Sequence, residues 1–204
     1  EGPGGFVECI CNMRKKYSSN TQDSITCMTL RSYKNIVPGW NKSGKIFREN
    51  KGLKIFYGKD DTGDLYKSEN ISALKKLISN KKSDIVTADG GFDFSTDYNH
   101  QEQLSLRLLF VESVSALSCL KKGGHFVLKI FDIHTTLTVK LLYFLSIYFK
   151  SIYITKPFTS RPANSEKYVV CKNFTGIDDE YLEELIYLVS EWEILADQNK
   201  QVRD

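Results

Sequence analysis

Apolar residues recur along the chain in two different spacings, and their alternation predicts a domain of mixed strands and helices. Short runs rich in apolar and β-branched residues, typical of strands, occupy residues 24–30, 53–57, 84–88, 125–131, 151–155 and 167–171. Longer stretches with apolar residues three or four positions apart, typical of helices, occupy residues 6–16, 68–79, 101–120, 137–149 and 178–197. This alternation indicates an α/β fold with a mostly parallel sheet.

Glycine, proline and polar residues mark the connections between these elements. Residues 31–51 contain Pro38, Gly39 and several lysines, and we expect them to form a long loop. Ser68 is a candidate N-cap for the helix that follows it, and Gly123 with Gly124 is expected to end the helix over 101–120. We find no internal repeat or linker, so residues 1–204 are expected to form one domain, with a core over 1–176 and a C-terminal helix over 177–204.

Composition narrows the class of protein without fixing its function. The 204 residues include 28 lysines and arginines against 25 acidic residues, a balance that permits an anionic partner without requiring one. No apolar run approaches the roughly 20 residues of a membrane-spanning helix, so no membrane partner is expected. Five cysteines without a C-x-x-C pair and three scattered histidines argue against a metal site and favour reduced, buried thiols.

Candidate chemistry lies at the ends of the expected strands, where open α/β sheets bind their ligands. Asp89 follows the strand over 84–88, Lys129 lies within the apolar strand over 125–131, and Glu166 precedes the strand over 167–171. A lysine in an apolar strand is costly to bury unpaired, so Lys129 needs a partner or a role, although the alternation does not decide which face it occupies. The three residues are about one strand–helix unit apart and are expected to converge at one edge. Asp89 alone also suits an Asx turn.

Two further loops carry features that suit a cofactor. A glycine turn at residues 2–5 lets the backbone approach a ligand closely, although such turns are as often purely structural. The loop after the strand over 53–57 contains Asp61 and Asp64, whose carboxylates suit a ribose hydroxyl, a base amine or a cationic cofactor. Solvated turn acids are an equally good interpretation of that loop taken alone.

Four segments together resemble a known family of enzymes. GPGGF at 2–6, ADGGF at 88–92, GGHFVLKIF at 123–131 and KPFTSRPANSEKYVVCKNF at 156–174 are similar to the FtsJ-like RNA ribose 2′-O-methyltransferases, especially the branch that modifies capped mRNA. The resemblance implies a Rossmann-like fold with an antiparallel last strand, S-adenosyl-L-methionine as cofactor, and methylation of the first transcribed nucleotide of capped mRNA. A ribose methyltransferase for rRNA or tRNA and a non-catalytic RNA-binding subunit remain as alternatives. A dinucleotide-binding dehydrogenase is disfavoured because G-x-G-x-x-G is absent.

The resemblance also assigns residues to roles. Asp89, Lys129 and Glu166 match the last three members of the family's Lys-Asp-Lys-Glu tetrad, in which the two acids would orient Lys129. The family's first lysine and first strand precede the glycine turn, so an incomplete sheet and an N-terminally truncated domain are expected. The cofactor-binding set implied is Gly2, Pro3, Gly4, Gly5, Phe6, Asp64, Leu65 and Asp89. The substrate-binding set implied is Asn99, His100, Gln101, Arg161 and Asn164.

An RNA substrate requires contacts to phosphates and bases. Basic residues of the expected loop, or Arg161, are candidates for phosphate binding, and Phe158 or Tyr98 for base stacking. The loop residues meant are Lys42, Lys45, Arg48 and Lys51, for which an ordinary solvated surface is the alternative. The resemblance implies a nuclear location for a cellular eukaryotic enzyme and the host cytoplasm for a viral one.

Overall fold

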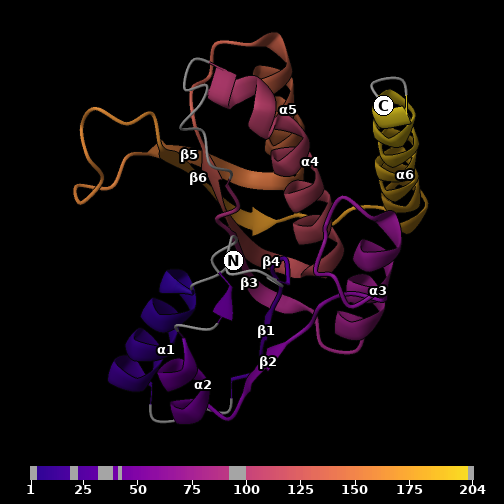
Figure 1. The fold of residues 1–204 in the computed structure, drawn as a ribbon. Helices are drawn as coiled ribbons and strands as arrows, with labels where there is room; N and C mark the ends of the chain where they lie inside the picture. The colour runs from indigo at the N-terminus through magenta and orange to yellow at the C-terminus, as the bar shows by residue number, and fades with distance from the viewer. Residues whose placement is uncertain (1–3, 19–22, 32–38, 41–42, 92–99, 202–204) are drawn as a thin grey trace. The chain divides into compact units, whose positions relative to one another are not determined.

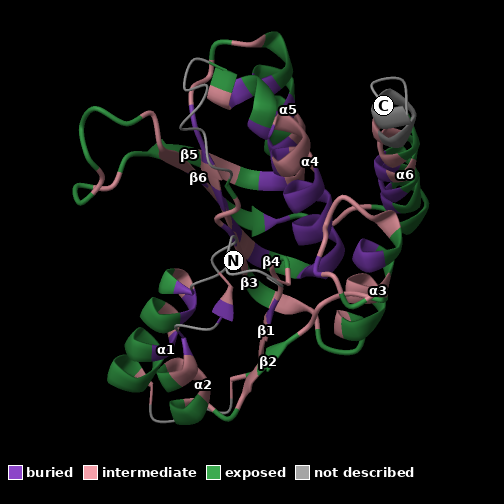
Figure 2. Cartoon of the chain, viewed as in Figure 1, coloured by how far each residue is buried: buried purple, intermediate pink, exposed green. Residues whose placement is uncertain are grey.

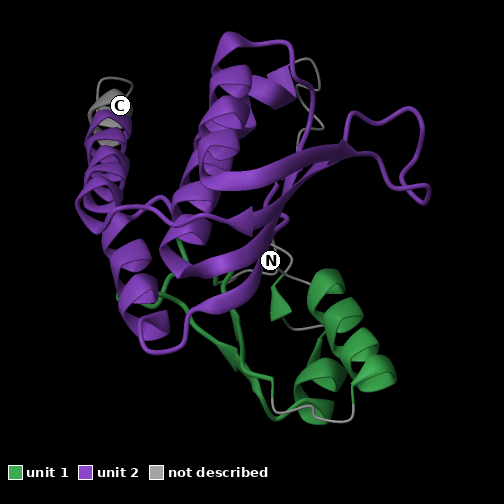
Figure 3. Ribbon diagram, turned by 180° about the vertical axis from the view of Figure 1, so that it is seen from behind, with its two compact units in different colours: residues 1–64 green, residues 65–204 purple. Residues whose placement is uncertain are grey.

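The chain forms two compact units, residues 1–64 and residues 65–204 (Figures 1 and 3). The computed structural model describes residues 4–18, 23–31, 39–40, 43–91 and 100–201. Each unit has its own hydrophobic cluster. Each of these clusters is built from residues of a single unit.

The first unit is a small α/β arrangement. It consists of α1 (Gly5–Tyr17), β1 (Ile25–Cys27), α2 (Gly44–Glu49) and β2 (Leu53–Ile55), and its two strands pair in parallel. Val7 and Cys11 of α1 pack with Cys27 and Trp40 to form its buried core. The predicted helix and the two predicted strands of this region are therefore confirmed.

The expectation of a continuous loop over 31–51 was wrong, because α2 lies inside it. The ring of Phe47 meets the ring of Trp40 edge-on, with centroids 5.4 Å apart. The side-chain amide of Asn50 donates a hydrogen bond to the carbonyl of Ile46 at 2.8 Å. A helix of six residues is too short to show an apolar period, and such short helices depend on tertiary packing for their stability.

The second unit carries a four-stranded sheet in the order β3-β4-β6-β5. β3 and β4 are parallel, and β6 is antiparallel to both of its neighbours, so β3, β4 and β5 share one direction. The sheet is therefore mixed, with one parallel and two antiparallel strand pairs, and its last strand in the sequence, β6, is antiparallel as predicted. The elements are α3 (Ser68–Ile78), β3 (Ser83–Ala88), α4 (Gln101–Cys119), β4 (Leu120–Ile130), α5 (Thr136–Tyr148), β5 (Phe149–Thr155), β6 (Lys167–Phe174) and α6 (Asp179–Gln201).

Two expected helix boundaries differ from the structure. α4 ends at Cys119 and the chain enters β4 at once, so Gly123 and Gly124 lie inside the strand and do not end the helix. The strand begins early because Leu120 pairs with Ser83, and Gly123, at a φ of 82°, lies in the irregular stretch that follows. Ser68 is the first residue of α3, and its N-cap is Lys67, whose side chain makes no capping bond.

The core of the second unit is centred on α4, which packs on β3 and β4 and also contacts α3, α5 and α6 (Figure 2). Val111, Val114 and Ala116 of this helix are fully buried. Four of the five cysteines are buried as expected, whereas Cys9 is exposed. No helix in the described ranges is long and apolar enough to cross a membrane.

Candidate active site

The carboxyl ends of β3 and β4 meet the start of β6 at one edge of the sheet. Ala88 pairs with Leu128, and Lys129 lies directly opposite Tyr168 on the antiparallel neighbour. Asp89 follows β3 and Glu166 precedes β6, so the sheet register brings both to the edge where Lys129 lies. The expected convergence of these residues is therefore a direct result of strand pairing.

The structure also settles the face on which Lys129 lies. Leu128 and Ile130 are fully buried in the core cluster. Lys129, between them, must point to the opposite face of the sheet because side chains alternate along a strand. Its side chain is still only 14% exposed, so its charge requires a partner nearby.

Asp89 supplies that partner through two of its oxygen atoms. The amine of Lys129 lies 2.9 Å from Asp89 Oδ1 and donates a hydrogen bond to the Asp89 backbone carbonyl at 3.1 Å. Gly91 lies against the same amine, since a Cβ at that position would stand 3.2 Å from Lys129 Nζ. The amine is thus held at a defined place beside a carboxylate, with the following turn kept free of side chains.

Glu166 contacts Tyr168, a residue that the sequence analysis did not single out. The Tyr168 hydroxyl donates to Glu166 Oε1 at 3.1 Å and lies 3.5 Å from Asp89 Oδ1. Burial, together with Asp89 and Glu166, raises the pKa of Tyr168, so its hydroxyl keeps its proton. Among the described residues no ion pair joins Glu166 to Lys129. The contacts of the described residues link Glu166 to the lysine through Tyr168 and Asp89.

The loop between β5 and β6 extends beyond the edge of the sheet (Figure 1). Lys156 organises it by donating to the carbonyls of Asn164 and Glu166, at 2.7 and 3.1 Å, and to Asn164 Oδ1 at 2.8 Å. Asn164, an expected substrate contact, is thereby bonded within the loop. Arg161 and Phe158 are exposed on the same loop.

The start of α4 joins two loops at this edge of the sheet. Gln101 accepts a hydrogen bond from the Ser165 hydroxyl at 3.0 Å. Glu102 accepts from the backbone N–H groups of His134 and Thr135, in the connection that follows β4. His100 is exposed at the N-cap position of the helix. The candidates Asn99 and Tyr98 lie outside the described residues.

The expected cofactor loop begins α1 in the first unit. Gly4 adopts a φ of 95°, and an added Cβ would stand 2.6 Å from the Trp40 ring, so both backbone and space require glycine. Gly5 and Phe6 form the first turn of α1. Gly2 and Pro3 lie outside the described part of the chain.

The acidic loop is built from side-chain-to-backbone bonds. Asp60 Oδ1 accepts from the backbone and the hydroxyl of Thr62 at 3.0 and 2.7 Å, and the Thr62 hydroxyl accepts from the Asp64 N–H at 3.2 Å. The Asp64 side chain is half-buried, and Leu65 packs against the core of the second unit. These bonds define the conformation of the loop that presents Asp64.

The basic residues that were expected to bind phosphate lie in and around α2. Lys45 lies 3.9 Å from Glu49, and Arg48 and Lys51 are exposed. Lys42 lies outside the described residues. Phosphate binding by this group stays a prediction.

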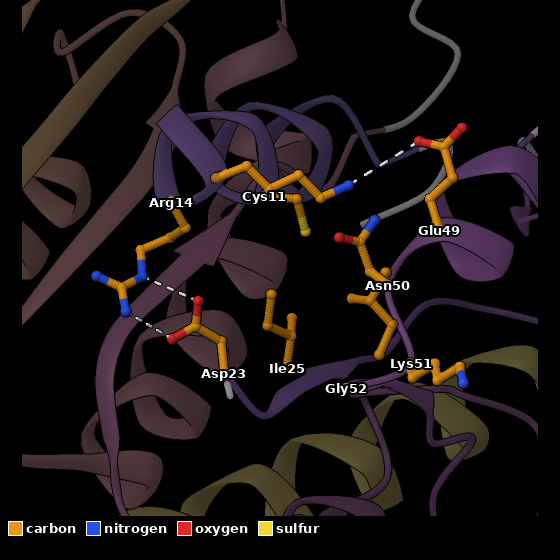
Figure 4. Close-up of a pocket in the computed structure, with 10 residues that line it drawn as sticks. Cys11, Arg14, Asp23, Ile25, Glu49, Asn50, Lys51 and Gly52 are labelled. Carbon is orange, nitrogen blue, oxygen red and sulfur yellow. Dashed lines mark hydrogen bonds and ion pairs between the residues drawn. The ribbon is translucent and has the colours of Figure 1, made fainter. Parts of the chain in front are cut away.

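A hollow of about 460 Å³ in the first unit has several charged side chains in its lining, among them the ion pairs Arg14–Asp23 and Lys15–Glu49 (Figure 4). The Arg14 guanidinium donates to both carboxylate oxygens of Asp23, at 2.9 and 3.0 Å. Burial raises the pKa of the Cys11 thiol above its usual value, despite the nearby Lys15. Such a thiol stays protonated and is a poor nucleophile, so the hollow shows no group poised for chemistry.

The mixed sheet with its antiparallel last strand, flanked by helices, agrees with a Rossmann-like methyltransferase domain, the class that the family model identifies. The chain belongs to the FtsJ-like methyltransferase family, whose model matches residues 1–174. A crystal structure described as a ribosomal RNA methyltransferase from Plasmodium falciparum covers 86% of this chain and 84% of its own, with a TM-score of 0.57 and 21% identity. That similarity supports the fold.

Curated relatives are named cap-specific mRNA (nucleoside-2′-O-)-methyltransferase 1. The mouse protein is 40% identical over 193 residues, which cover 89% of this chain and 22% of the relative. The protein from Trypanosoma cruzi is 36% identical over 186 residues, which cover 89% of this chain and 48% of the relative. The chain therefore spans about a fifth to a half of the length of these relatives.

Proposed function

We propose that the chain is the catalytic domain of an S-adenosyl-L-methionine-dependent methyltransferase that modifies the ribose 2′-hydroxyl of the first transcribed nucleotide in capped mRNA. Membership of the family and the names of relatives up to 40% identical support the reaction and the substrate. The observation that carries the proposal is the Lys129 amine held by Asp89 at the edge where β3, β4 and β6 meet.

The residues present fit the proposed cofactor. Gly4 provides a side-chain-free turn before α1, where backbone can approach a ligand, and Asp64 provides a carboxylate that suits ribose hydroxyls. The carboxylate of Asp89 suits a positively charged sulfur. When bound, S-adenosyl-L-methionine would supply a methyl group for transfer to the ribose oxygen, and its sulfur would keep the electron pair of the broken carbon–sulfur bond.

The chain's own groups position the hydroxyl that receives the methyl. In its neutral form the Lys129 amine accepts the proton of the ribose 2′-hydroxyl as the oxygen bonds to the methyl group, and the ammonium that results is paired with Asp89. Asp89 fixes the amine through its carboxylate and its backbone carbonyl. Tyr168 holds Glu166 beside this pair, so the four groups together restrict the position of the attacking oxygen.

RNA binding is assigned to the loop between β5 and β6. The exposed Arg161 guanidinium suits a phosphate, and the fully exposed Phe158 ring suits base stacking. Because the acceptor is a 2′-hydroxyl, the partner is RNA and not DNA.

The test is transfer of labelled methyl to RNA by the full-length protein and its Lys129→Met variant. We expect the variant to lose about 100-fold or more of the rate, the scale of a group that moves a proton in the reaction. Lys140→Met is the matched control, since Lys140 is exposed on α5, and it should keep the parental rate. Equal rates for Lys129→Met and the parent would refute the role of the lysine.

The RNA in the assay decides the substrate. A capped transcript lacking ribose methylation should accept the methyl, and the same transcript without its cap should accept at least tenfold less. Equal transfer to uncapped RNA would reject the cap-specific proposal and favour an rRNA or tRNA substrate. S-adenosyl-L-methionine should also raise the melting temperature, because it binds the native state.

A further inference from the structure

A buried carboxyl group lies behind the turn that carries Asp89. Glu112, on α4, is only 6% exposed, and its Oε1 accepts a hydrogen bond from the Gly90 N–H at 2.9 Å. Its second oxygen, Oε2, is buried and has no hydrogen-bond partner within the described part of the chain. Charged residues are seldom buried without a full set of partners, so this placement calls for an explanation.

The Gly90 N–H and the Asp89 carbonyl belong to a single peptide unit. A peptide unit is planar and, in its usual trans form, directs its N–H and its C=O to opposite sides. Glu112 binds this unit on one side at 2.9 Å, and Lys129 binds it on the other at 3.1 Å. Rotation of the peptide would break both bonds, so Glu112 fixes the direction in which the carbonyl meets the lysine.

The packing around Gly90 leaves no room for a side chain at that position. A Cβ added at Gly90 would stand 2.4 Å from Glu112 Oε1 and 2.8 Å from Leu108 Cδ2. The α4 side chains therefore press directly against the turn, and only glycine lets them approach this closely. Contact and hydrogen bond together couple the position of α4 to that of the Asp89 backbone.

We propose that Glu112 is a positioning residue for methyl transfer, which acts by holding the Asp89–Gly90 peptide so that its carbonyl and the Asp89 carboxylate together place the Lys129 amine. The inference rests on the proposed function, since it gives Glu112 a role in the same reaction. It adds to the site a residue from the middle of α4, whose start already contacts the loops at this edge through Gln101 and Glu102.

The protonation of Glu112 gives an independent signal for this contact. Burial raises the pKa of Glu112 to about 7, although the Gly90 N–H bond lowers it. Among the charged side chains that face it, Lys129 lowers the pKa and Asp89 raises it. Either protonation state leaves Oε1 free to accept from Gly90, but the ionised form binds the N–H more strongly.

Two substitutions separate positioning from simple support of the helix. Glu112→Gln keeps an oxygen acceptor of the same shape, and Glu112→Met removes it while keeping similar volume. We expect Glu112→Met to lower kcat for methyl transfer about tenfold with little change in KM for capped RNA, as for loss of about one hydrogen bond. Glu112→Gln should retain most of the parental kcat.

Ser113→Ala is the matched control on the same helix. Within the described ranges the buried Ser113 hydroxyl donates to the Leu109 carbonyl of the preceding turn, so its loss perturbs α4 without removing the bond to Gly90. It should leave kcat unchanged. A parental kcat for Glu112→Met, or an equal fall in kcat for Glu112→Gln and Glu112→Met, would overturn the proposal.

An NMR titration keeps this inference separate from the proposed function. The amide proton of Gly90 should shift with a midpoint near pH 7 in the full-length parent, and this step should vanish in Glu112→Gln. If the parent transfers methyl to no RNA, the proposed function fails while the amide titration still tests the contact. If Glu112→Met does not fold, the proposal is tested by the rate of Glu112→Gln and by the titration. A Gly90 amide whose chemical shift does not change near pH 7 in the parent rejects the contact.

Discussion

The Tyr168 hydroxyl lies between two carboxylates, so removing it tests positioning without changing any charge. Tyr168→Phe loses the bond to Glu166 and the longer contact to Asp89. We expect the rate of methyl transfer to fall about threefold to tenfold, the scale of one hydrogen bond. Tyr153→Phe, an exposed tyrosine on β5, is the control and should match the parent. An unchanged rate in Tyr168→Phe would show that Glu166 does not need this link.

Some residues of the candidate site could be predicted from the sequence and others could not. Lys129 stood out because a lysine in an apolar strand is costly, and Asp89 and Glu166 stood out because they flank strands. Tyr168 did not stand out, since a tyrosine in an apolar strand is read as a core residue. The Tyr168 hydroxyl reaches the site because Tyr168 pairs with Lys129 across β4 and β6. The register between two strands so far apart in the sequence cannot be predicted from the residues near either one.

Glu112 was missed for a related reason. Its neighbours on α4 predict an amphipathic helix with polar residues toward solvent, whereas the helix is buried on most sides, including Ser113 and Ser118. Which helix ends up enclosed depends on where α3, α5 and α6 pack, and this follows from the complete fold.

At the scale of elements, Glu102 ties α4 to the start of α5. Its carboxylate accepts the N–H groups of His134 and Thr135 and the Thr135 hydroxyl, at 2.8 to 3.0 Å. Glu102→Gln places an amide among these donors and should lower the free energy of unfolding by about 2 kcal/mol. Denaturant unfolding of the full-length protein measures this, with the exposed Glu184→Gln on α6 as control. A loss no larger than the control's would contradict the assigned anchoring role.

The same carboxylate gives a pH dependence with a defined sign. Burial alone would raise the pKa of Glu102, but bonds from Thr135, Thr138 and His134 lower it from 4.5 to about 2. A group whose pKa is lower in the folded state stabilises the fold above its unfolded pKa. That contribution is lost as the pH falls from about 4.5 to about 2, and Glu102→Gln should not show this loss.

Whole elements were predicted where their patterns were long. The helices α1, α3, α4, α5 and α6 and the strands β3, β4, β5 and β6 were expected near their observed positions, because each repeats a period over several residues. The three-residue strands β1 and β2 were expected from the apolar and β-branched residues in and around them. α2 and the early start of β4 were not expected, since a six-residue helix and a strand containing Gly123 carry no clear period. Packing of Phe47 on Trp40 and pairing of Leu120 with Ser83 determine them instead.

At the scale of the whole molecule, the two units have cores of very different size. The second unit buries a large cluster across its sheet and helices, whereas the first buries Val7, Cys11, Cys27 and Trp40. The apolar surface removed from water must offset the conformational entropy lost on ordering. The first unit therefore has less free energy available to resist local opening.

Native-state hydrogen exchange on the full-length protein should reveal this difference. The amides that join β1 to β2 should exchange with an opening free energy at least about 2 kcal/mol below that of the amides joining β4 to β6. The strands β1 and β2 are each three residues long, and Lys54 and Ile55 of β2 are exposed. The single domain expected over residues 1–204 instead requires both ladders to open together, so equal protection would favour it. If protection is unequal, the proposed cofactor loop that leads into α1 belongs to the less stable unit, and S-adenosyl-L-methionine is expected to slow exchange in β1 more than in β4.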